Sequence, residues 1–417
     1  MKPNILFIVV DCLRADHVYG EKAHIPTIKR LMKNGYSFLN AISSTSTTTP
    51  SFASMLTGLY PFENGVRSHS GYSLKKNTES IAKMLKKDVY HTYAEVTGPL
   101  VKETGLFDDF DEHNYREKDS KGIHGQWGQT LIEKFRKKYK EPWFILLHVF
   151  ELHEPRKVPD CCKNKKCGNT LYARALSGID QYLGRLLDAA GDNTLVILTG
   201  DHGEQIEKSS FEKNWKKCYG TFFKKLKKYN LTKTHFSVGM RNFHIGHGYS
   251  IYDGLVKIPL VFCCSKSVPR GSSKLQVRQV DITPTIVDLA GVTGNYRFSG
   301  KTLLPIMNEK EKSSRDAYLE AVGIVIPKKE DWLAGIRVDN KYKYIYSPFN
   351  RNFREELYDL EKDPEEKANI ADKNKEIVKM LRKKIGKLKT EKMLGEKIEE
   401  KDQEIMLKRL KALGYFE

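Results

Sequence analysis

The sequence contains no long hydrophobic run. The apolar stretch Ile5–Val10 and others like it are far shorter than the roughly 20 residues that cross a membrane as a helix. The hydrophobic share of 40% and the aromatic share of 11% nevertheless match those of a folded protein. A length of 417 residues suffices for one large domain with an appendage, or for two to three domains of average size. The composition therefore excludes a disordered chain and predicts a large hydrophobic core.

Cysteine is also scarce. The seven cysteines form an odd number, and the adjacent pairs Cys161-Cys162 and Cys263-Cys264 do not suit a disulfide framework. The chain begins Met1-Lys2-Pro3-Asn4 and enters its first apolar run directly, and that run ends at Asp11 without a small-residue cleavage site. We therefore expect reduced thiols and a cytoplasmic protein.

Acidic residues are fewer than basic ones, 52 against 71, which gives a formal net charge of +19. Such an excess attracts polyanions. The charge is spread widely here, however, and in the C-terminal part lysine alternates with glutamate as on a solvated helix face. We expect no specific binding of nucleic acid, and we expect an anionic ester substrate, either free or at a membrane surface. The sequence does not indicate an oligomeric state.

Helix and strand patterns alternate through the first three hundred residues, as is typical of a sheet covered by helices on both faces. The predicted strands are apolar runs at Asn4–Val10, His91–Val96, Trp143–Phe150, Asn193–Thr199 and Leu260–Cys263. The predicted helices between them have apolar residues at helical spacing, at Thr27–Asn34, Ser51–Thr57, Thr78–Lys86 and Leu171–Ala190. This order predicts a doubly wound α/β domain over residues 1–310.

The pattern changes after residue 310. Residues 317–321 and 332–346 alternate like antiparallel strands, with a turn at Asp339-Asn340. From residue 374 onward the chain is charged and amphipathic. We expect a smaller α+β subdomain over residues 311–417, closed by helices. The basic stretch 205–242 has no clear periodicity, and we interpret it as an insertion that forms a lid near the site.

Metal-ligand residues follow two of the predicted strands. Asp201 and His202 come after the apolar run Leu195–Leu198, and Asp11 ends the run Ile5–Val10. Ligands in open α/β sheets gather at the carboxyl ends of strands, and oxygen and nitrogen ligands suit one divalent cation. The alternative is that these are ordinary turn residues, since aspartate and glycine are common after strands.

A nucleophile is suggested by a tract of hydroxyl residues, Ser43–Thr49, that runs into Pro50, Ser51 and a short helix. Pro50 and Ser51 suit the first helical turn, which leaves a hydroxyl of Thr48 or Thr49 at the positive end of the helix dipole. An anionic ester would be attracted to the same place, and a bound cation could activate the hydroxyl. The alternative is a helix cap without catalytic function.

The segment Thr48–Pro61, Thr-Thr-Pro-Ser-Phe-Ala-Ser-Met-Leu-Thr-Gly-Leu-Tyr-Pro, resembles the signature of the sulfatase family of the alkaline phosphatase superfamily. That signature is Cys or Ser, any residue, Pro, Ser, Arg, and then Leu-Thr-Gly and Tyr-Pro. Other segments resemble family motifs in the family's order, at residues 3–11, 148–155, 199–203, 247–260, 281–285, 299–305 and 356–364. The resemblance implies an alkaline-phosphatase-like mixed sheet flanked by helices. It also implies a divalent metal ion at Asp11, Thr48, Asp201 and His202, and catalytic roles for Thr48, His153 and His247.

The chain departs from this family at four positions. Thr48 stands where sulfatases convert Cys or Ser to formylglycine, and because threonine carries a methyl on Cβ its oxidation gives at best a ketone. Phe52 replaces the arginine that supports the modified residue, and Cys12 replaces a second aspartate. His202 stands in place of the usual asparagine. We therefore expect no formylglycine, and one manganese, zinc or magnesium ion rather than calcium.

Three functions are consistent with this sequence. A metal-activated threonine is what phosphodiesterases and phosphotransferases of the superfamily use, so the first hypothesis is a metal-dependent hydrolase or transferase that acts on phosphoesters through Thr48. His153 and His247 would bind a non-bridging oxygen or protonate the leaving group. The alternative, favoured by the breadth of the resemblance, is a sulfuric ester hydrolase. The second alternative is a non-catalytic binding protein on the same fold.

Overall fold

The computed structural model describes residues 2–117, 122–137, 139–206, 247–324, 329, 332–388 and 396–413. The basic insertion predicted at 205–242 therefore lies outside the described residues except for Gln205 and Ile206. Among the helices that are described, none combines the length and the apolar character needed to cross a membrane.

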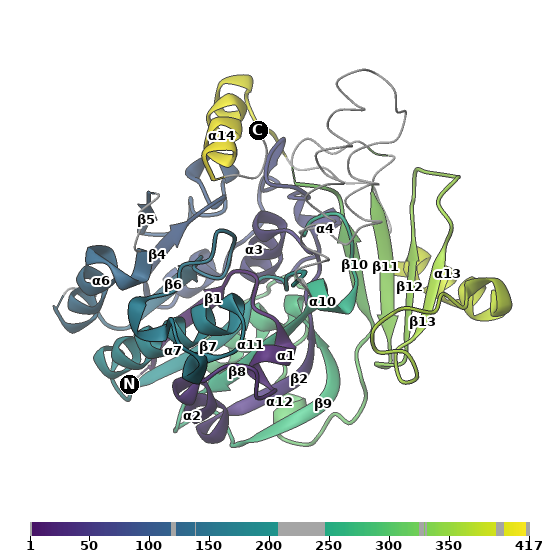
Figure 1. The fold of residues 1–417 in the computed structure, drawn as a ribbon. Coiled ribbons are helices and arrows are strands. Elements are labelled where there is room, and N and C mark those ends of the chain that lie inside the picture. The colour runs from purple at the N-terminus through teal and green to yellow at the C-terminus, as the bar shows by residue number, and fades with distance from the viewer. Residues whose placement is uncertain are drawn as a thin grey trace.

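The centre of the molecule is an eight-stranded sheet with the strand order β5-β4-β6-β1-β7-β8-β2-β9 (Figure 1). The strands β5, β4, β6, β1 and β7 are mutually parallel, whereas β8 is antiparallel to both β7 and β2. The sheet is therefore mixed, as predicted. Its strands are β1 Asn4–Val10, β2 Tyr36–Ile42, β4 His91–Thr97, β5 Glu112–Arg116, β6 Trp143–Val149, β7 Thr194–Gly200, β8 Lys257–Cys263 and β9 Gly271–Arg278.

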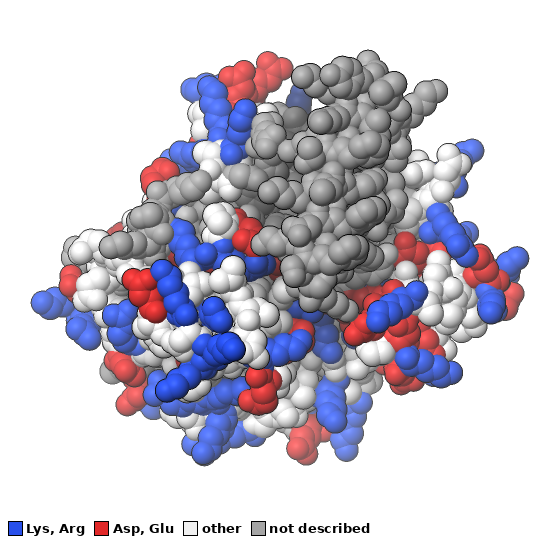
Figure 2. Space-filling view, in the orientation of Figure 1, with Lys and Arg blue, Asp and Glu red and all other residues white. Residues whose placement is uncertain are grey.

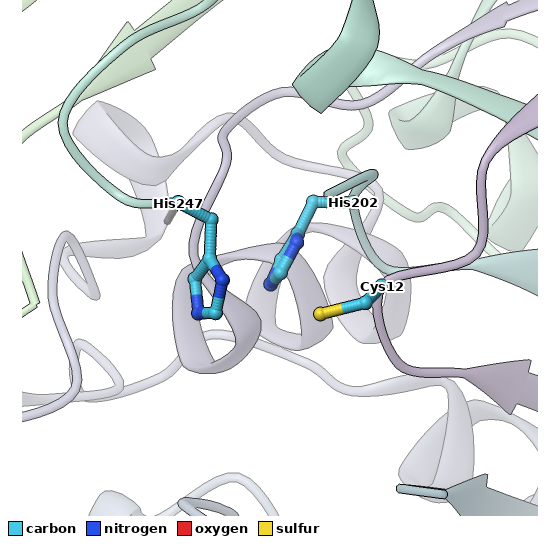
Figure 3. A group of neighbouring side chains, drawn as sticks. All are labelled: Cys12, His202 and His247. Carbon is cyan, nitrogen blue, oxygen red and sulfur yellow. The ribbon is translucent and has the colours of Figure 1, made fainter. Parts of the chain in front are cut away.

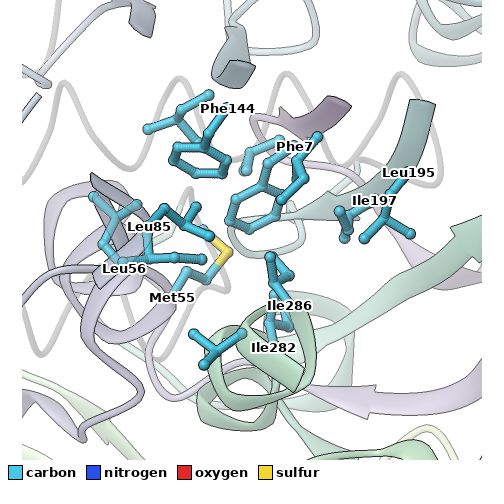
Figure 4. Packing of buried hydrophobic residues seen from close by; sticks show 14 of the residues in the cluster. Phe7, Met55, Leu56, Leu85, Phe144, Leu195, Ile197, Ile282 and Ile286 are labelled. Atoms are coloured by element: carbon cyan, nitrogen blue, oxygen red, sulfur yellow. The ribbon is translucent and has the colours of Figure 1, made fainter. Parts of the chain in front are cut away.

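Helices cover both faces of this sheet because successive side chains of its strands alternate between the faces. In β1, Ile5 and Phe7 belong to the core under α3, α5 and α11, whereas Leu6 and Ile8 belong to the core under α2, α6 and α7. Figure 4 shows Phe7 packed in the first of these cores. Full burial of one such side chain stabilises the fold by about 1.5–3 kcal/mol. The helices are α2 Pro26–Asn34, α3 Thr48–Thr57, α5 Ile81–Lys86, α6 Gln126–Lys137, α7 Leu171–Ala190 and α11 Ile282–Leu289.

A second, four-stranded antiparallel sheet follows, in the order β10-β11-β12-β13. Asp339 and Asn340 form the turn between β11 and β12, and their φ angles of 50° and 59° are those of a tight hairpin turn. Helix α13 packs against this sheet, which gives the smaller α+β unit that the sequence predicts. Its elements are β10 Ala317–Ala321, β11 Leu333–Val338, β12 Tyr342–Tyr346, β13 Glu356–Asp359 and α13 Lys375–Leu388.

The C-terminal part of the chain returns to the N-terminal part and forms a separate two-stranded sheet with it. Strand β14 (Glu396–Lys397) pairs with β3 (Tyr72–Ser73), and Met406 of helix α14 (Glu400–Leu413) packs with Ile398 against Val101. Arg67 connects the N-terminal part of the chain to the second sheet. Its guanidinium makes two hydrogen bonds to the buried carboxylate of Glu320 on β10, at 2.7 and 2.9 Å. Short helices complete the fold at α1 Ala15–Val18, α4 Pro61–Asn64, α10 Asp253–Val256 and α12 Leu304–Met307.

Charged side chains of both signs are widely distributed over the described residues of one face of the molecule. Figure 2 shows lysine and arginine over much of the visible face, with aspartate and glutamate among them. On the described residues of this face, this mixture is typical of a solvated charged surface.

Candidate active site

Strands β1 and β7 bring the predicted metal ligands together. The two strands are parallel neighbours in which Val10 pairs with Gly200, so Asp11 and Asp201 follow side by side at the carboxyl edge of the sheet. One ligand atom from each of Asp11, Asp201 and His202 lies within 4.8 Å of the others. All three side chains are completely buried.

The hydrogen bonds of Asp201 and His202 leave one oxygen and one nitrogen atom facing each other. Asp201 Oδ1 accepts from the backbone N–H groups of Cys12 (3.0 Å) and His202 (2.7 Å). Its Oδ2 has no hydrogen-bond partner in the described part of the chain and lies 3.4 Å from His202 Nε2. His202 Nδ1 is 2.7 Å from the carbonyl oxygen of Gly203, so Nδ1 carries a hydrogen and, in this tautomer, Nε2 is an acceptor. Two facing acceptors in a buried site fit a bound cation.

The pKa values of the two carboxylates shift in opposite directions. Burial alone would raise the pKa of Asp11, but the hydrogen bond to His148 and the nearby histidine rings hold the pKa well below its usual range. Burial and the neighbouring charge of Asp11 instead raise the pKa of Asp201. Repulsion between two buried carboxylates has this effect. A cation bound between them would stabilise both charged forms.

Helix α3 begins at Thr48, three residues before the predicted start at Ser51. Its first backbone hydrogen bond runs from Ser51 N–H to the carbonyl oxygen of Thr47, at 3.1 Å. Pro50 fits inside this first turn because the N–H groups there have no partner within the helix. The hydroxyl tract therefore continues into the helix, which places Thr48 at its N-terminal end.

Of the two predicted hydroxyls, Thr48 is the one that faces the carboxylates. Its Oγ1 lies 3.2 Å from His202 Nε2 and 3.4 Å from Asp11 Oδ2. Thr49 Oγ1 lies 2.8 Å from His69 Nδ1 instead. The geometry thus places Thr48 beside the candidate metal ligands, as the resemblance implies.

The structure also brings the two predicted catalytic histidines to the site. The ring centroid of His247 lies 4.5 Å from that of His202 and 5.3 Å from that of His153. Burial lowers the pKa of His153 to about 4, and its Nδ1 is 2.7 Å from the carbonyl oxygen of Glu154. Burial would also lower the pKa of His247, but Glu204, 3.5 Å from its Nδ1, raises it. Near neutral pH, His153 is therefore neutral and His247 is the better proton donor.

Sequence reasoning missed His148. Its Nε2 lies 3.2 Å from Asp11 Oδ2, and its Nδ1 lies 3.1 Å from the carbonyl oxygen of Thr97. Phe52, which stands in place of the family's arginine, meets the edge of this ring at a centroid distance of 5.0 Å. The register of β6, in which His148 pairs with Val9 of β1, is the signal that could have located it.

Two further groups reach the site from outside the predicted motif residues. His69 approaches Thr49 from the loop after α4, and burial holds the pKa of His69 well below its usual range. Glu204 lies beyond β7, where its Oε2 is 3.6 Å from the sulfur of Cys12. Its pKa is lowered to about 2, because His247 stabilises the carboxylate against the effect of burial.

Cys12 lies between the candidate metal ligands. Its Sγ is 2.9 Å from Asp11 Oδ1, and one ligand atom from each of Cys12, His202 and His247 lies within 4.8 Å of the others. Figure 3 shows these three side chains directed into the same space. Burial and the surrounding carboxylates raise the pKa of the Cys12 thiol well above its usual range.

The chain matches two family models. The model named "Sulfatase" matches residues 3–292, and the model named "N-sulphoglucosamine sulphohydrolase, C-terminal" matches residues 247–391. An ulvan-active sulfatase of Formosa agariphila is 23% identical, over 89% of this chain and 76% of that protein. An arylsulfatase of Clostridium perfringens is 21% identical, over 92% of this chain and 93% of that protein.

Solved structures agree with this fold. A phosphonate monoester hydrolase of Agrobacterium radiobacter aligns with a TM-score of 0.72 and 18% identity, over 93% of this chain and 95% of that chain. The structure of Ps i-CgsB with k-i-k-neocarrahexaose aligns with a TM-score of 0.70 and 20% identity, over 99% and 98%. The chain therefore belongs to the sulfatase family of the alkaline phosphatase superfamily, a family of ester hydrolases.

Proposed function

We propose that this chain hydrolyses an anionic sulfuric ester with Thr48 Oγ1 as the nucleophile. The observation that carries the proposal is the position of this hydroxyl, buried at the start of α3 beside His202 and Asp11. The names of the relatives favour sulfuric esters over phosphoesters. The hydrolysis or transfer of a phosphoester, which was the first hypothesis from the sequence, therefore becomes the second candidate. The substrate class remains that of an anionic ester.

With threonine as the nucleophile, hydrolysis proceeds by two successive displacements at sulfur instead of through a formylglycine. In the first step, Thr48 Oγ1 forms a bond to sulfur as the bond from sulfur to the ester oxygen breaks, and the leaving alcohol takes a proton. In the second step, water attacks the sulfur of the threonine sulfate ester, which releases sulfate and restores the hydroxyl. No oxidised side chain is needed, because the threonine oxygen itself is the nucleophile.

The surrounding residues supply the proton transfers. Asp11 accepts a hydrogen bond from the Thr48 hydroxyl, His247 donates a proton to the leaving oxygen, and neutral His153 accepts one from the attacking water. The N-terminus of α3 adds a positive partial charge where the ester's negative charge is held. A divalent cation held by Asp11, Asp201, His202 and Thr48 would lower the pKa of the nucleophile and neutralise the transferred group.

The second candidate is hydrolysis or transfer of a phosphoester. It is supported by Thr48, which cannot become an aldehyde, and by the Asp201-His202 pair in place of Asp-Asn. A phosphotransferase would pass the group from Thr48 to an acceptor alcohol instead of water. The same residues serve both candidates. In each reaction the Thr48 hydroxyl attacks a tetrahedral sulfur or phosphorus atom whose oxygens carry negative charge.

Parallel assays distinguish these candidates. We would measure kcat/KM for an aryl sulfate, the matching phosphate monoester and a phosphodiester, with manganese, zinc or magnesium and after chelation. The proposal expects fastest turnover of the sulfate, with loss of activity on chelation and recovery on metal addition. A preference for either phosphoester by about tenfold or more would replace it with the second candidate.

A protein that turned over none of these esters and bound no divalent ion would favour the non-catalytic alternative. The metal identity, the cytoplasmic location and action at a membrane surface stay predictions. Metal analysis of the purified protein, cell fractionation and sedimentation with anionic vesicles would test them.

A further inference from the structure

Three thiols gather in the segment that joins β6 to α7, outside the candidate active site. Cys161 and Cys162 belong to the 3₁₀ helix Asp160–Cys162, and their sulfurs are 4.0 Å apart. Cys167 belongs to the 3₁₀ helix Lys165–Cys167, which packs against the first one. The Cys167 thiol makes a hydrogen bond with the thiol of Cys162 and lies 3.9 Å from the carbonyl oxygen of Cys161. Two thiols in contact are the starting point for a disulfide.

Gln181 of α7 holds two of these sulfurs side by side. Its Nε2 donates to Cys162 Sγ at 3.4 Å, and its Oε1 accepts from Cys161 Sγ at 3.3 Å. Burial, together with the contact with the neighbouring thiols, raises the pKa of Cys162. The side chain of α7 thus fixes the reduced cluster, so its sulfurs are close together before any bond forms between them.

The three thiols differ in their access to solvent. Cys161 is exposed, whereas Cys162 is completely buried and Cys167 is 6% exposed. A buried thiol with a raised pKa reacts slowly with reagents in solution, because the thiolate is the nucleophile. An oxidant from solution therefore reacts first at Cys161, and the buried pair receives the oxidation from there.

Lysines beside Cys161 favour an oxidant that carries negative charge. Lys165 and Lys166 are exposed on the same segment, and exposed Lys163 pairs with Asp160 at 2.6 Å. Positive side chains raise the local concentration of anions. Glutathione disulfide is such an anion near neutral pH, because its carboxylates outnumber its amines. Its disulfide bond is also the electrophile that a thiolate attacks.

We propose that Cys162 and Cys167 form a reversible disulfide by exchange with a small anionic disulfide, such as glutathione disulfide, that enters at Cys161. The Cys161 sulfur attacks glutathione disulfide, which releases one glutathione and leaves a mixed disulfide. Cys162 then displaces the second glutathione, and attack of Cys167 on the Cys162 sulfur restores the Cys161 thiol. Two protein thiols are oxidised, one glutathione disulfide is reduced to two glutathiones, and the two thiol protons pass to them. This site goes beyond the proposed function and does not depend on which ester is hydrolysed.

Peptide mapping of the full chain tests the site without an activity measurement. The reduced protein is equilibrated with glutathione and its disulfide, quenched in acid, alkylated in denaturant and digested with trypsin. Cleavage after lysine and arginine separates the two cysteine peptides, so a Cys162–Cys167 disulfide links peptide 158–163 to peptide 167–174. We expect this linked pair with one alkyl group, on Cys161. In urea, where the fold no longer holds the sulfurs together, the pair should require a glutathione mixture about tenfold more oxidising or more.

Variants separate the buried pair from the entry thiol. Cys167→Ser should lose the linked pair and accumulate glutathione on Cys161. Cys161→Ser should form the pair about tenfold or more slowly. Cys264→Ser is the matched control, because Cys263 and Cys264 are another adjacent pair, half-buried and buried, and it should behave as the wild type does. Thermal unfolding confirms that each variant is folded.

Four results would overturn the proposal. They are a wild type that carries only glutathione adducts, a linked pair in which Cys162 is the alkylated residue, an unchanged rate in Cys161→Ser, and equal oxidation in the folded protein and in urea. An inactive protein that gave the expected peptides would contradict the proposed function alone.

Discussion

Replacement of Thr48 by alanine removes the proposed nucleophile and little else. The side chain is completely buried, and its two hydrogen-bond distances of 3.2 and 3.4 Å are long. Loss of one methyl and one weakly bonded hydroxyl should cost about 1–2 kcal/mol. Because domains typically have about 5–15 kcal/mol of stability, Thr48→Ala should remain folded.

The catalytic loss should be much larger than the loss of stability. Without an attacking oxygen, only the binding and electrostatic contributions of the site remain, and we expect kcat to fall about 10⁴-fold. At 1.36 kcal/mol per factor of ten, this corresponds to about 5.5 kcal/mol of lost transition-state stabilisation. Initial rates on the best ester substrate measure it, and metal analysis shows whether the cation is still bound.

Thr48→Ser is the matched variant, because it restores the oxygen without the methyl group. It should keep activity within about tenfold of the wild type, and intact mass measurement confirms that the serine is unmodified. An acid-quenched reaction of the wild type should carry the transferred group on Thr48. A folded, metal-bound Thr48→Ala protein that retained more than about a tenth of the wild-type rate would refute the assignment.

Three other predictions concern binding, stability and pH. Asp201→Asn should weaken cation binding about tenfold or more in a titration, because it removes a charged ligand; unchanged binding would argue against this site. Arg67→Ala should lower the free energy of unfolding in urea by about 3–5 kcal/mol, since it leaves the buried Glu320 carboxylate unpaired, and an effect below about 1 kcal/mol would contradict this. Burial lowers the pKa of His113, so below about pH 6.5 the unfolded chain binds more protons and stability falls. His113→Gln should make unfolding less sensitive to pH in this range, and an unchanged pH profile would contradict that.

Much of the fold could be predicted because buried parallel strands are continuous apolar runs. Ile5–Val10 and Leu195–Leu198 are of this kind and were located correctly. Strand β2 was missed because Ser37 and Asn40 interrupt its apolar pattern, and β9 because it begins with Gly271 and a polar stretch. Both lie near the antiparallel edge of the sheet, where local pattern is a weaker guide.

The resemblance to the sulfatase family located Thr48, His153 and His247, whereas local pattern alone located only the site residues that follow a strand end. Asp11 and Asp201 are such residues, and the parallel order of their strands places them together. His148 lies inside a strand, so only the register of the assembled sheet shows that its ring meets Asp11. His69 reaches the site through long-range packing, which local sequence patterns do not encode, whereas Glu204 follows His202 by only two residues.

The contact of the C-terminal segment with residues near Val101 affects the order in which the protein completes its fold. Arg409 and Glu103 are neighbours although they lie 306 positions apart in the sequence, and contacts of such long range form slowly. During synthesis, Val101 is made long before Ile398 and Met406, which cover it in the finished protein. The surface around Val101 therefore stays exposed through most of translation, when uncovered apolar side chains favour aggregation.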